Sequence, residues 1–121
     1  MLSLPGRVFL CTLPTDMRKG FDTLAALVQT HLDQYALSGD LFVFRSRRGD
    51  RIKLLYWDDD GYVIFYKRLE EGSFTLPAAD GKRRSAGAHG LVLRPAELAM
   101  LLDGVDLSSV RRHKRYQRPA E

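Results

Sequence analysis

The sequence predicts a small α+β protein in which an antiparallel β-meander of three to five strands packs with two α-helices and a disordered basic C-terminal tail follows. Two observations predict this fold. Residues 41–69 hold three runs rich in aromatic and β-branched residues, separated by short turns, whereas 21–35 and 96–103 repeat apolar residues at helical spacing. At 121 residues and 45% hydrophobic content, the chain suits one domain, which we place at 1–107, with the tail at 108–121.

The first part of the chain predicts a short strand and a helix. Residues 7–12 alternate weakly between apolar and polar side chains and are bounded by prolines, which is typical of a strand between turns. The apolar spacing over 21–35 indicates an amphipathic helix of about four turns. Cys11 lies in the apolar strand, and no pattern that stabilises a thiolate surrounds it. We therefore expect Cys11 to be a small core residue.

Residues 41–57 are the most strongly patterned stretch and predict a hairpin. The run 41–45 is rich in aromatic and β-branched residues, and the loop 46–50 contains a glycine, which suits a five-residue connection. The returning strand, 52–57, alternates so that Ile52, Leu54 and Tyr56 share one face and Lys53, Leu55 and Trp57 share the other.

The C-terminal half predicts the remaining elements. Asp and Gly residues at 58–61 indicate a turn into a third strand, 62–69, and 73–76 is short enough for a fourth. Residues 77–90 lack apolar periodicity and predict a mobile surface loop. A proline at the first helical position precedes the second helix, 96–103. We expect both helices to cover the same face of the sheet.

The net charge of +4 is unevenly distributed along the chain. Residues 1–110 contain 14 basic and 14 acidic residues, whereas 111–121 contain 5 basic and 1 acidic. A basic tail on a neutral body favours a polyanionic partner such as DNA, although such tails also serve only for solubility.

The sequence shows no pattern of a membrane-spanning or exported protein. No apolar run approaches the roughly 18 residues that span a bilayer, and the N-terminus lacks the basic start and long apolar stretch of an export signal. We therefore expect a cytoplasmic protein without membrane contact, associated with the nucleoid if it binds DNA.

The hairpin and the strand after it carry a cluster of cations with tyrosines and a tryptophan between them. Arginines beside aromatic rings on an antiparallel sheet can grip phosphates or stack bases. The alternative is that the rings belong to the core, which the apolar strand faces favour, and that the charges protect a solvated edge. The candidate nucleic-acid-binding residues are Arg18, Lys19, Arg45, Arg47, Arg48, Arg51, Lys53, Lys67 and Arg68, with Arg111, Arg112, Lys114 and Arg115 in the tail.

Arg18 and Lys19 precede the first helix, where exposed amide groups make the potential positive and cations are unfavourable. A phosphate bound by these two side chains, Gly20 and the helix end would explain their position. The alternative is that Asp16 caps the helix and neutralises the pair.

The acidic residues predict no metal site or catalytic residue. Asp58–Asp60 are adjacent on a tight turn and lack the spaced ligands of a calcium loop. The three histidines are scattered and have no partnering cysteine. We predict no cofactor and no enzymatic activity. A metal-dependent nuclease using Asp16, Asp50 or Asp58–Asp60, brought together by folding, remains an alternative.

Three stretches resemble a known family. They are TDMRKGFDTLAALV at 15–28, LFVFRSRRGDRIKLLYWDDDGYVIFYKRLEEGSF at 41–74 and RPAELAMLLDGVD at 94–106. They are similar to the accessory protein encoded by the second reading frame of bacterial insertion sequence 66-type transposable elements. The family label TnpB is shared with an unrelated RNA-guided nuclease, whose activity is not implied.

The resemblance implies a role in transposition beside a separate transposase that carries the DNA-cutting residues. It supplies no catalytic residues for this chain. We therefore expect a non-catalytic accessory protein that binds DNA, the transposase or both through the basic hairpin and tail. A protein-interaction module that docks on the transposase without DNA contact is the second reading, and the oligomeric state is left open.

Overall fold

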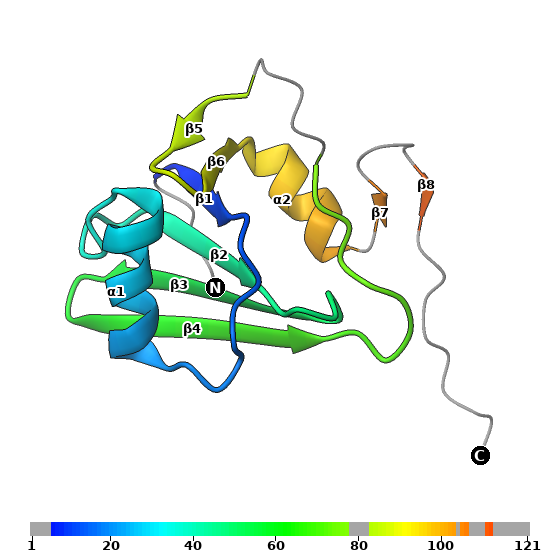
Figure 1. Cartoon of the computed structure of the whole chain (residues 1–121), viewed down its shortest axis with the longest axis horizontal. Helices are drawn as coiled ribbons and strands as arrows, with labels where there is room; N and C mark the ends of the chain where they lie inside the picture. Colours follow the sequence, from blue (N-terminus) through cyan, green and yellow to red (C-terminus); the bar gives the residue numbers. More distant parts are fainter. Residues whose placement is uncertain (1–5, 78–82, 104, 107–110, 113–121) are drawn as a thin grey trace.

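The computed structural model describes residues 6–77, 83–103, 105–106 and 111–112 and is shown in Figure 1. Six strands form one sheet in the order β4-β3-β2-β1-β6-β5, and two further short strands pair with each other. The elements along the chain are β1 (Val8–Cys11), α1 (Phe21–Leu32), β2 (Leu41–Arg45), β3 (Arg51–Asp58), β4 (Gly61–Arg68), β5 (Ser85–Ala86), β6 (Gly90–Leu93), α2 (Pro95–Leu102), β7 (Val105–Asp106) and β8 (Arg111–Arg112).

The predicted α+β fold and the meander are confirmed. Strands β2, β3 and β4 pair antiparallel in sequence order, and the predicted turn at 58–61 joins the last two. Asp59 has a φ of 52°, in the left-handed region that Asp tolerates better than most residues. The sheet is larger than the predicted three to five strands, because β1 and the β5–β6 pair extend it beyond β2.

Strand β1 makes the sheet mixed, because it runs parallel to β2. Parallel neighbours cannot be joined by a tight turn, and α1 is the crossover between them. This helix ends at Leu32, earlier than the predicted residue 35. Asp33 adopts a left-handed conformation with φ of 50°, and its N–H donates to the carbonyl of Val28, which closes the last turn.

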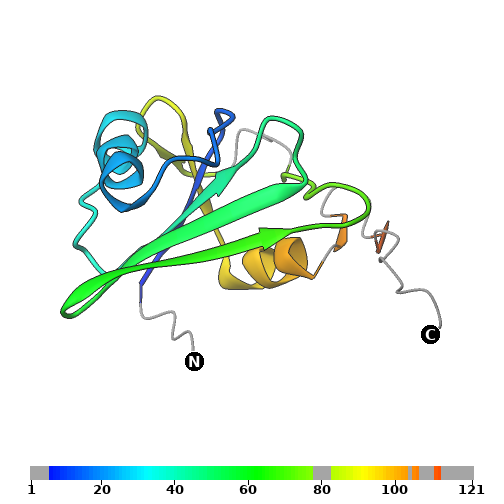
Figure 2. The ribbon, with the colours of Figure 1, turned by 90° about the horizontal axis from the view of Figure 1, so that it is seen from below.

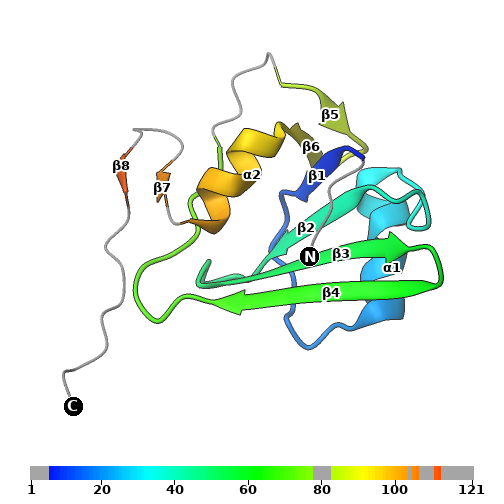
Figure 3. The same ribbon diagram turned by 180° about the vertical axis from the view of Figure 1, so that it is seen from behind.

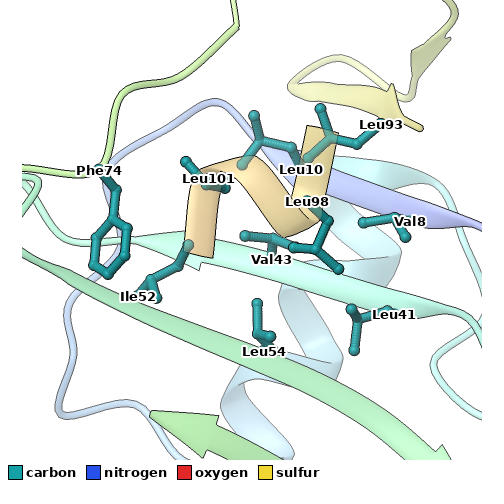
Figure 4. Packing of buried hydrophobic residues seen from close by; sticks show 10 residues of the cluster. All are labelled: Val8, Leu10, Leu41, Val43, Ile52, Leu54, Phe74, Leu93, Leu98 and Leu101. Atoms are coloured by element: carbon teal, nitrogen blue, oxygen red, sulfur yellow. The ribbon is translucent and has the colours of Figure 1, made fainter. Parts of the chain in front are cut away.

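The two helices lie on opposite faces of the sheet, as Figures 2 and 3 show, so the prediction of one shared face is wrong. The runs VFLC of β1 and LFVF of β2 are buried on both faces and therefore need cover on both sides. Under α1, Phe9 stacks on Phe42 at 5.7 Å between ring centroids. The cluster under α2, drawn in Figure 4, consists of Val8, Leu10, Leu41, Val43, Ile52, Leu54, Phe74, Leu93, Leu98 and Leu101.

The prediction of a short strand at 73–76 is wrong, because these residues form no strand. The Phe74 N–H donates to the carbonyl of Gly49 at 2.7 Å and its carbonyl accepts from Arg45 Nε at 2.8 Å. The segment therefore crosses the end of the β2–β3 hairpin and inserts one ring into the core.

The predicted mobile loop at 77–90 instead contains strand β5 and a buried ion pair. Within its described part, the Arg83 side chain is only 14% exposed and makes two hydrogen bonds of 2.6 Å to Glu97 of α2. The run Lys-Arg-Arg at 82–84 has the composition of a solvated surface segment, so local sequence gives no sign of this contact.

The end of the chain differs from a fully disordered tail at two residues. The backbones of Arg111 and Arg112 pair with β7 in an antiparallel ladder. Lys114 and Arg115 lie outside the described residues, and the division into a domain and a tail stays a prediction.

Candidate functional site

A cleft of about 650 Å³ lies where the segment before α1 meets the end of the β2–β3 hairpin. Pro14 to Arg18 form one wall, Ser46 to Arg51 contribute the other, and Tyr66 of β4 completes it. In Figure 1 the blue segment that leads into α1 passes across the strands beside this hairpin. Two features that the sequence predicted separately, Arg18 before the helix and the basic hairpin, are therefore brought together in one cleft, whereas Lys19 does not line it. Its charged residues are Arg18, Arg47, Arg48, Arg51, Asp16 and Asp50.

Two hydrogen bonds hold the walls of the cleft together. The Thr15 N–H donates to the carbonyl of Arg45 at 2.9 Å. The Lys53 ammonium donates to the carbonyl of Lys19 at 2.8 Å and lies 4.8 Å from the centroid of the Tyr66 ring. Lys53 is only 9% exposed. The Lys53 ammonium thus links β3 to β4 and to the segment before α1.

The hairpin end satisfies its own polar groups. The Ser46 N–H donates to the Arg51 carbonyl at 2.9 Å, and the Ser46 hydroxyl accepts from the Arg51 N–H at 3.1 Å. Gly49, with φ of +79°, donates its N–H back to the Ser46 carbonyl at 3.0 Å. This closed loop leaves the side chains of Arg47 and Arg48 exposed. Within the described residues, no hydrogen bond or ion pair engages either guanidinium.

Arg18 and Arg51 are more constrained. Arg18 makes a two-pronged ion pair with Asp16, with its shortest N–O distance at 2.7 Å. Hydrogen bonds from the Arg18 side chain and backbone hold the pKa of Asp16 well below its usual range. Arg51 is half-buried, and its Nη1 reaches the Tyr66 hydroxyl at 3.5 Å. Both guanidinium groups nonetheless border the cleft.

The alternative prediction was that Asp16 caps α1 and neutralises the neighbouring cations, and only its second part agrees with the structure, for Arg18. Asp16 pairs with Arg18, but it does not cap α1. Gly20 occupies the N-cap position, and its N–H donates to the Thr23 hydroxyl at 3.0 Å.

Several candidate cations have structural contacts. Arg45 donates to the Phe74 carbonyl, and burial lowers its pKa. Lys67 donates to the carbonyl of Leu102 at 2.8 Å, at the negative end of α2, where a cation is favourable. Arg68 forms an ion pair with Glu70 at 2.8 Å. Sequence alone could not separate these residues from Arg47 and Arg48, because only the packing shows which charged groups have partners.

The aromatic residues divide between core and surface. Tyr56 packs against the cluster under α2 and Tyr62 against the one under α1, which confirms the core interpretation for both. Trp57 meets Tyr62 edge to face at 5.1 Å. Tyr66 differs, because it is 47% exposed and borders the cleft.

The acidic residues named in the nuclease alternative are brought together only in part, because Asp16 and Asp50 border the cleft and the other three aspartates do not. Asp50 precedes β3, whereas Asp58 is the last residue of this strand and Asp59 and Asp60 follow it, so the length of β3 separates Asp50 from all three. Across the described residues, no group of three or more His, Cys, Asp or Glu side chains is placed to hold a metal ion. Two of the histidines, His31 and His89, do meet edge to face at 5.4 Å. No helix in the described part of the chain is long and apolar enough to cross a membrane.

The fold and the cleft define a small α+β protein with four arginines around one opening. Residues 6–112 match the family described as IS66 Orf2 like protein, and the chain belongs to this family. It is 44% identical over 100 residues to the uncharacterized protein y4hO of Sinorhizobium fredii (strain NBRC 101917 / NGR234), which covers 83% of this chain and 81% of that protein. It is 37% identical over 116 residues to the uncharacterized protein y4jC of the same organism, at 95% and 92% coverage. No solved structure matches the chain.

Family membership confirms the resemblance found in the sequence. It associates the chain with the transposition of insertion sequence 66-type elements, as an accessory protein.

Proposed function

We propose that the protein is a non-catalytic accessory factor of transposition that binds DNA through the cleft between the hairpin and the segment before α1. The observation that carries this proposal is the environment of the Arg47 and Arg48 side chains. Both are exposed beside the cleft, and the described residues supply neither with an anionic partner. A guanidinium group presents donors in a planar fork that matches a phosphate.

The charge balance of the cleft supports a phosphate ligand. Four arginines face two aspartates, and one of these, Asp16, is already paired with Arg18. The cleft therefore keeps a net positive charge after its internal ion pair is counted. Contacts of this kind position a protein on DNA but do not read its sequence, so the proposal includes no preferred base sequence.

The test is a titration of labelled duplex DNA at several salt concentrations. Each phosphate contact contributes about −0.9 to the slope of log affinity against log salt. Replacing Arg47 or Arg48 by alanine should weaken binding and make the slope shallower by about 1 each. Arg84→Ala is the matched control, because it removes an exposed arginine next to β5, at the opposite edge of the sheet from β4. Equal effects of Arg48→Ala and Arg84→Ala would reject the cleft as the binding site.

The basic tail requires its own variant. Replacing Arg111, Arg112, Lys114 and Arg115 by glutamine in the full chain should lower affinity further without abolishing binding. If only this replacement affects binding, the folded part of the protein does not contact DNA.

A second candidate function, docking on the transposase, is favoured by a different surface. A groove of about 710 Å³ runs along α1 and the loop after it, and it combines the acidic residues Asp22 and Asp33 with apolar side chains. Tyr35 is 66% exposed and Leu37 38% exposed, and together in one groove they offer an aromatic and an aliphatic side chain that a partner can cover. We propose that a basic segment of the transposase binds there. Co-purification with the transposase should be lost in Tyr35→Ser/Leu37→Ser and retained in Arg47→Ala/Arg48→Ala. The opposite pattern would place the transposase at the cleft.

A further inference from the structure

The cleft is bordered by an aromatic ring, that of Tyr66, which two cations contact. Tyr66 pairs directly with Lys53 across β3 and β4, and the Lys53 ammonium lies 4.8 Å from the ring centroid. Arg51 reaches the Tyr66 hydroxyl at 3.5 Å. The ring is still 47% exposed, and it borders the cleft together with Arg47 and Arg48. The structure therefore presents an exposed aromatic face next to two arginines that no described residue engages through a hydrogen bond or an ion pair.

This arrangement combines the two elements that recognise a nucleotide outside a duplex. Proteins bind single strands by stacking bases on aromatic side chains while a positively charged groove follows the backbone. Stacking requires a base whose face is free, and in a duplex the neighbouring base pairs cover that face. A tyrosine side chain has few rotatable bonds, so it loses little conformational freedom on binding. The cleft volume of about 650 Å³ lies within the range of about 300–1,000 Å³ that is usual for sites of small organic ligands, and it can take one nucleotide.

We propose that the cleft binds single-stranded DNA, with one unpaired base stacked on the free face of Tyr66 and the adjoining phosphates on Arg47 and Arg48. This inference rests on the proposed DNA-binding function and specifies the form of DNA. Lys53 occupies the opposite face of the ring, which leaves one face for the base. Arg51 contacts the hydroxyl edge of the ring and borders the cleft together with Arg47 and Arg48.

The test compares labelled single-stranded DNA with a duplex of the same sequence, using the full chain at one moderate salt concentration. Wild type should bind the single strand more tightly. Tyr66→Leu removes the ring and should lower single-strand affinity about 5- to 150-fold, the range of one stacking contact, with little effect on the duplex. Tyr66→Phe keeps the ring and should stay within about 3-fold of wild type, because stacking depends on the π-face and not on the hydroxyl.

A second measurement on the unaltered protein guards against a folding defect in Tyr66→Leu. The ring-proton NMR signals of Tyr66 should shift when single-stranded DNA is added and should shift much less with duplex. Equal binding of both DNA forms with no effect of Tyr66→Leu would overturn the inference. In that case the DNA-binding proposal would still stand if Arg48→Ala made the salt slope shallower. Absence of binding to either form would reject both, and tighter binding of RNA than of DNA of the same sequence would overturn the assignment to DNA.

Discussion

Replacing Lys53 by methionine should destabilise the protein and loosen the cleft, although Lys53 is not placed to contact DNA. Its ammonium is directed to the Lys19 carbonyl at 2.8 Å and to the Tyr66 ring at 4.8 Å. The residue is 9% exposed and lies on the α1 side of the sheet, beside Leu55. Methionine has a similar length and fits an apolar surrounding, so the change tests the charge and its hydrogen bond.

The expected loss is about 2 kcal/mol. Loss of a hydrogen bond from a charged group costs about 1.5–3 kcal/mol, and a partly buried cation–π contact is worth about 0.5–2 kcal/mol. Removing a buried charge relieves a desolvation cost that offsets part of this loss. For a chain of this size, about 2 kcal/mol corresponds to a decrease in Tm of about 10 °C.

Urea unfolding followed by circular dichroism measures the change, with Arg48→Ala as the control. Arg48 is exposed, and its removal should change the unfolding free energy by no more than about 0.5 kcal/mol. In DNA titrations the two variants should differ in how strongly binding depends on salt. Lys53→Met should weaken binding at an unchanged salt slope, and Arg48→Ala should reduce the slope by about 1. A Lys53→Met protein as stable as wild type would show that Lys53 does not support the cleft. A salt slope reduced like that of Arg48→Ala would show that Lys53 contacts phosphate.

Two further predictions concern the supports of the fold. Gly49→Ala should destabilise by about 2 kcal/mol, because alanine is strained at φ +79° and its Cβ would meet the Arg45 guanidinium. Gly61→Ala is the control, because a Cβ at this position meets nothing within 4 Å, and it should cost about 1 kcal/mol or less in thermal unfolding. Equal losses of stability in the two variants would contradict the argument that Gly49 is required at the hairpin end. Glu97 should make the fold acid-sensitive, because hydrogen bonds from Arg83 lower its pKa from 4.5 to about 2. Its folded pKa is depressed, so its stabilisation is complete above about pH 4.5 and is lost as the pH falls toward 2, by up to about 3 kcal/mol. Urea unfolding at pH 6 and pH 3 should show a smaller difference for Glu97→Gln than for wild type, and parallel loss in both proteins would exclude this ion pair as the cause.

The sequence predicted those parts of the fold whose contacts are close in the chain. The meander follows from alternation and short turns between β2, β3 and β4, and α1 follows from its apolar spacing. The pairing of β1 with β2 and the burial of Arg83 against Glu97 depend on residues far apart in the chain. A run of cations such as 82–84 has the same composition whether it is solvated or paired, so no local pattern distinguishes the two cases.

The site was predictable as a set of cations but not as a cleft. The sequence pointed to Arg18 and to the hairpin separately, and only the fold places them on facing walls. The sequence does contain one signal for the buried lysine. The alternation of β3 puts Lys53 on the same face as Leu55 and Trp57, and a lysine on an apolar face is a sign of a buried, partnered ammonium. The exposed position of Tyr66 could not be inferred, because the strand pattern alone suits a core ring equally well.

The most direct measurement is an NMR titration of the ¹⁵N-labelled full chain with a short DNA. The cleft proposal predicts that the largest amide shifts fall in two segments separated along the chain, 15–19 and 46–51, and that they saturate together. Small shifts there, with the main changes in the α1 groove at 33–37 or only in residues 111–121, would contradict it.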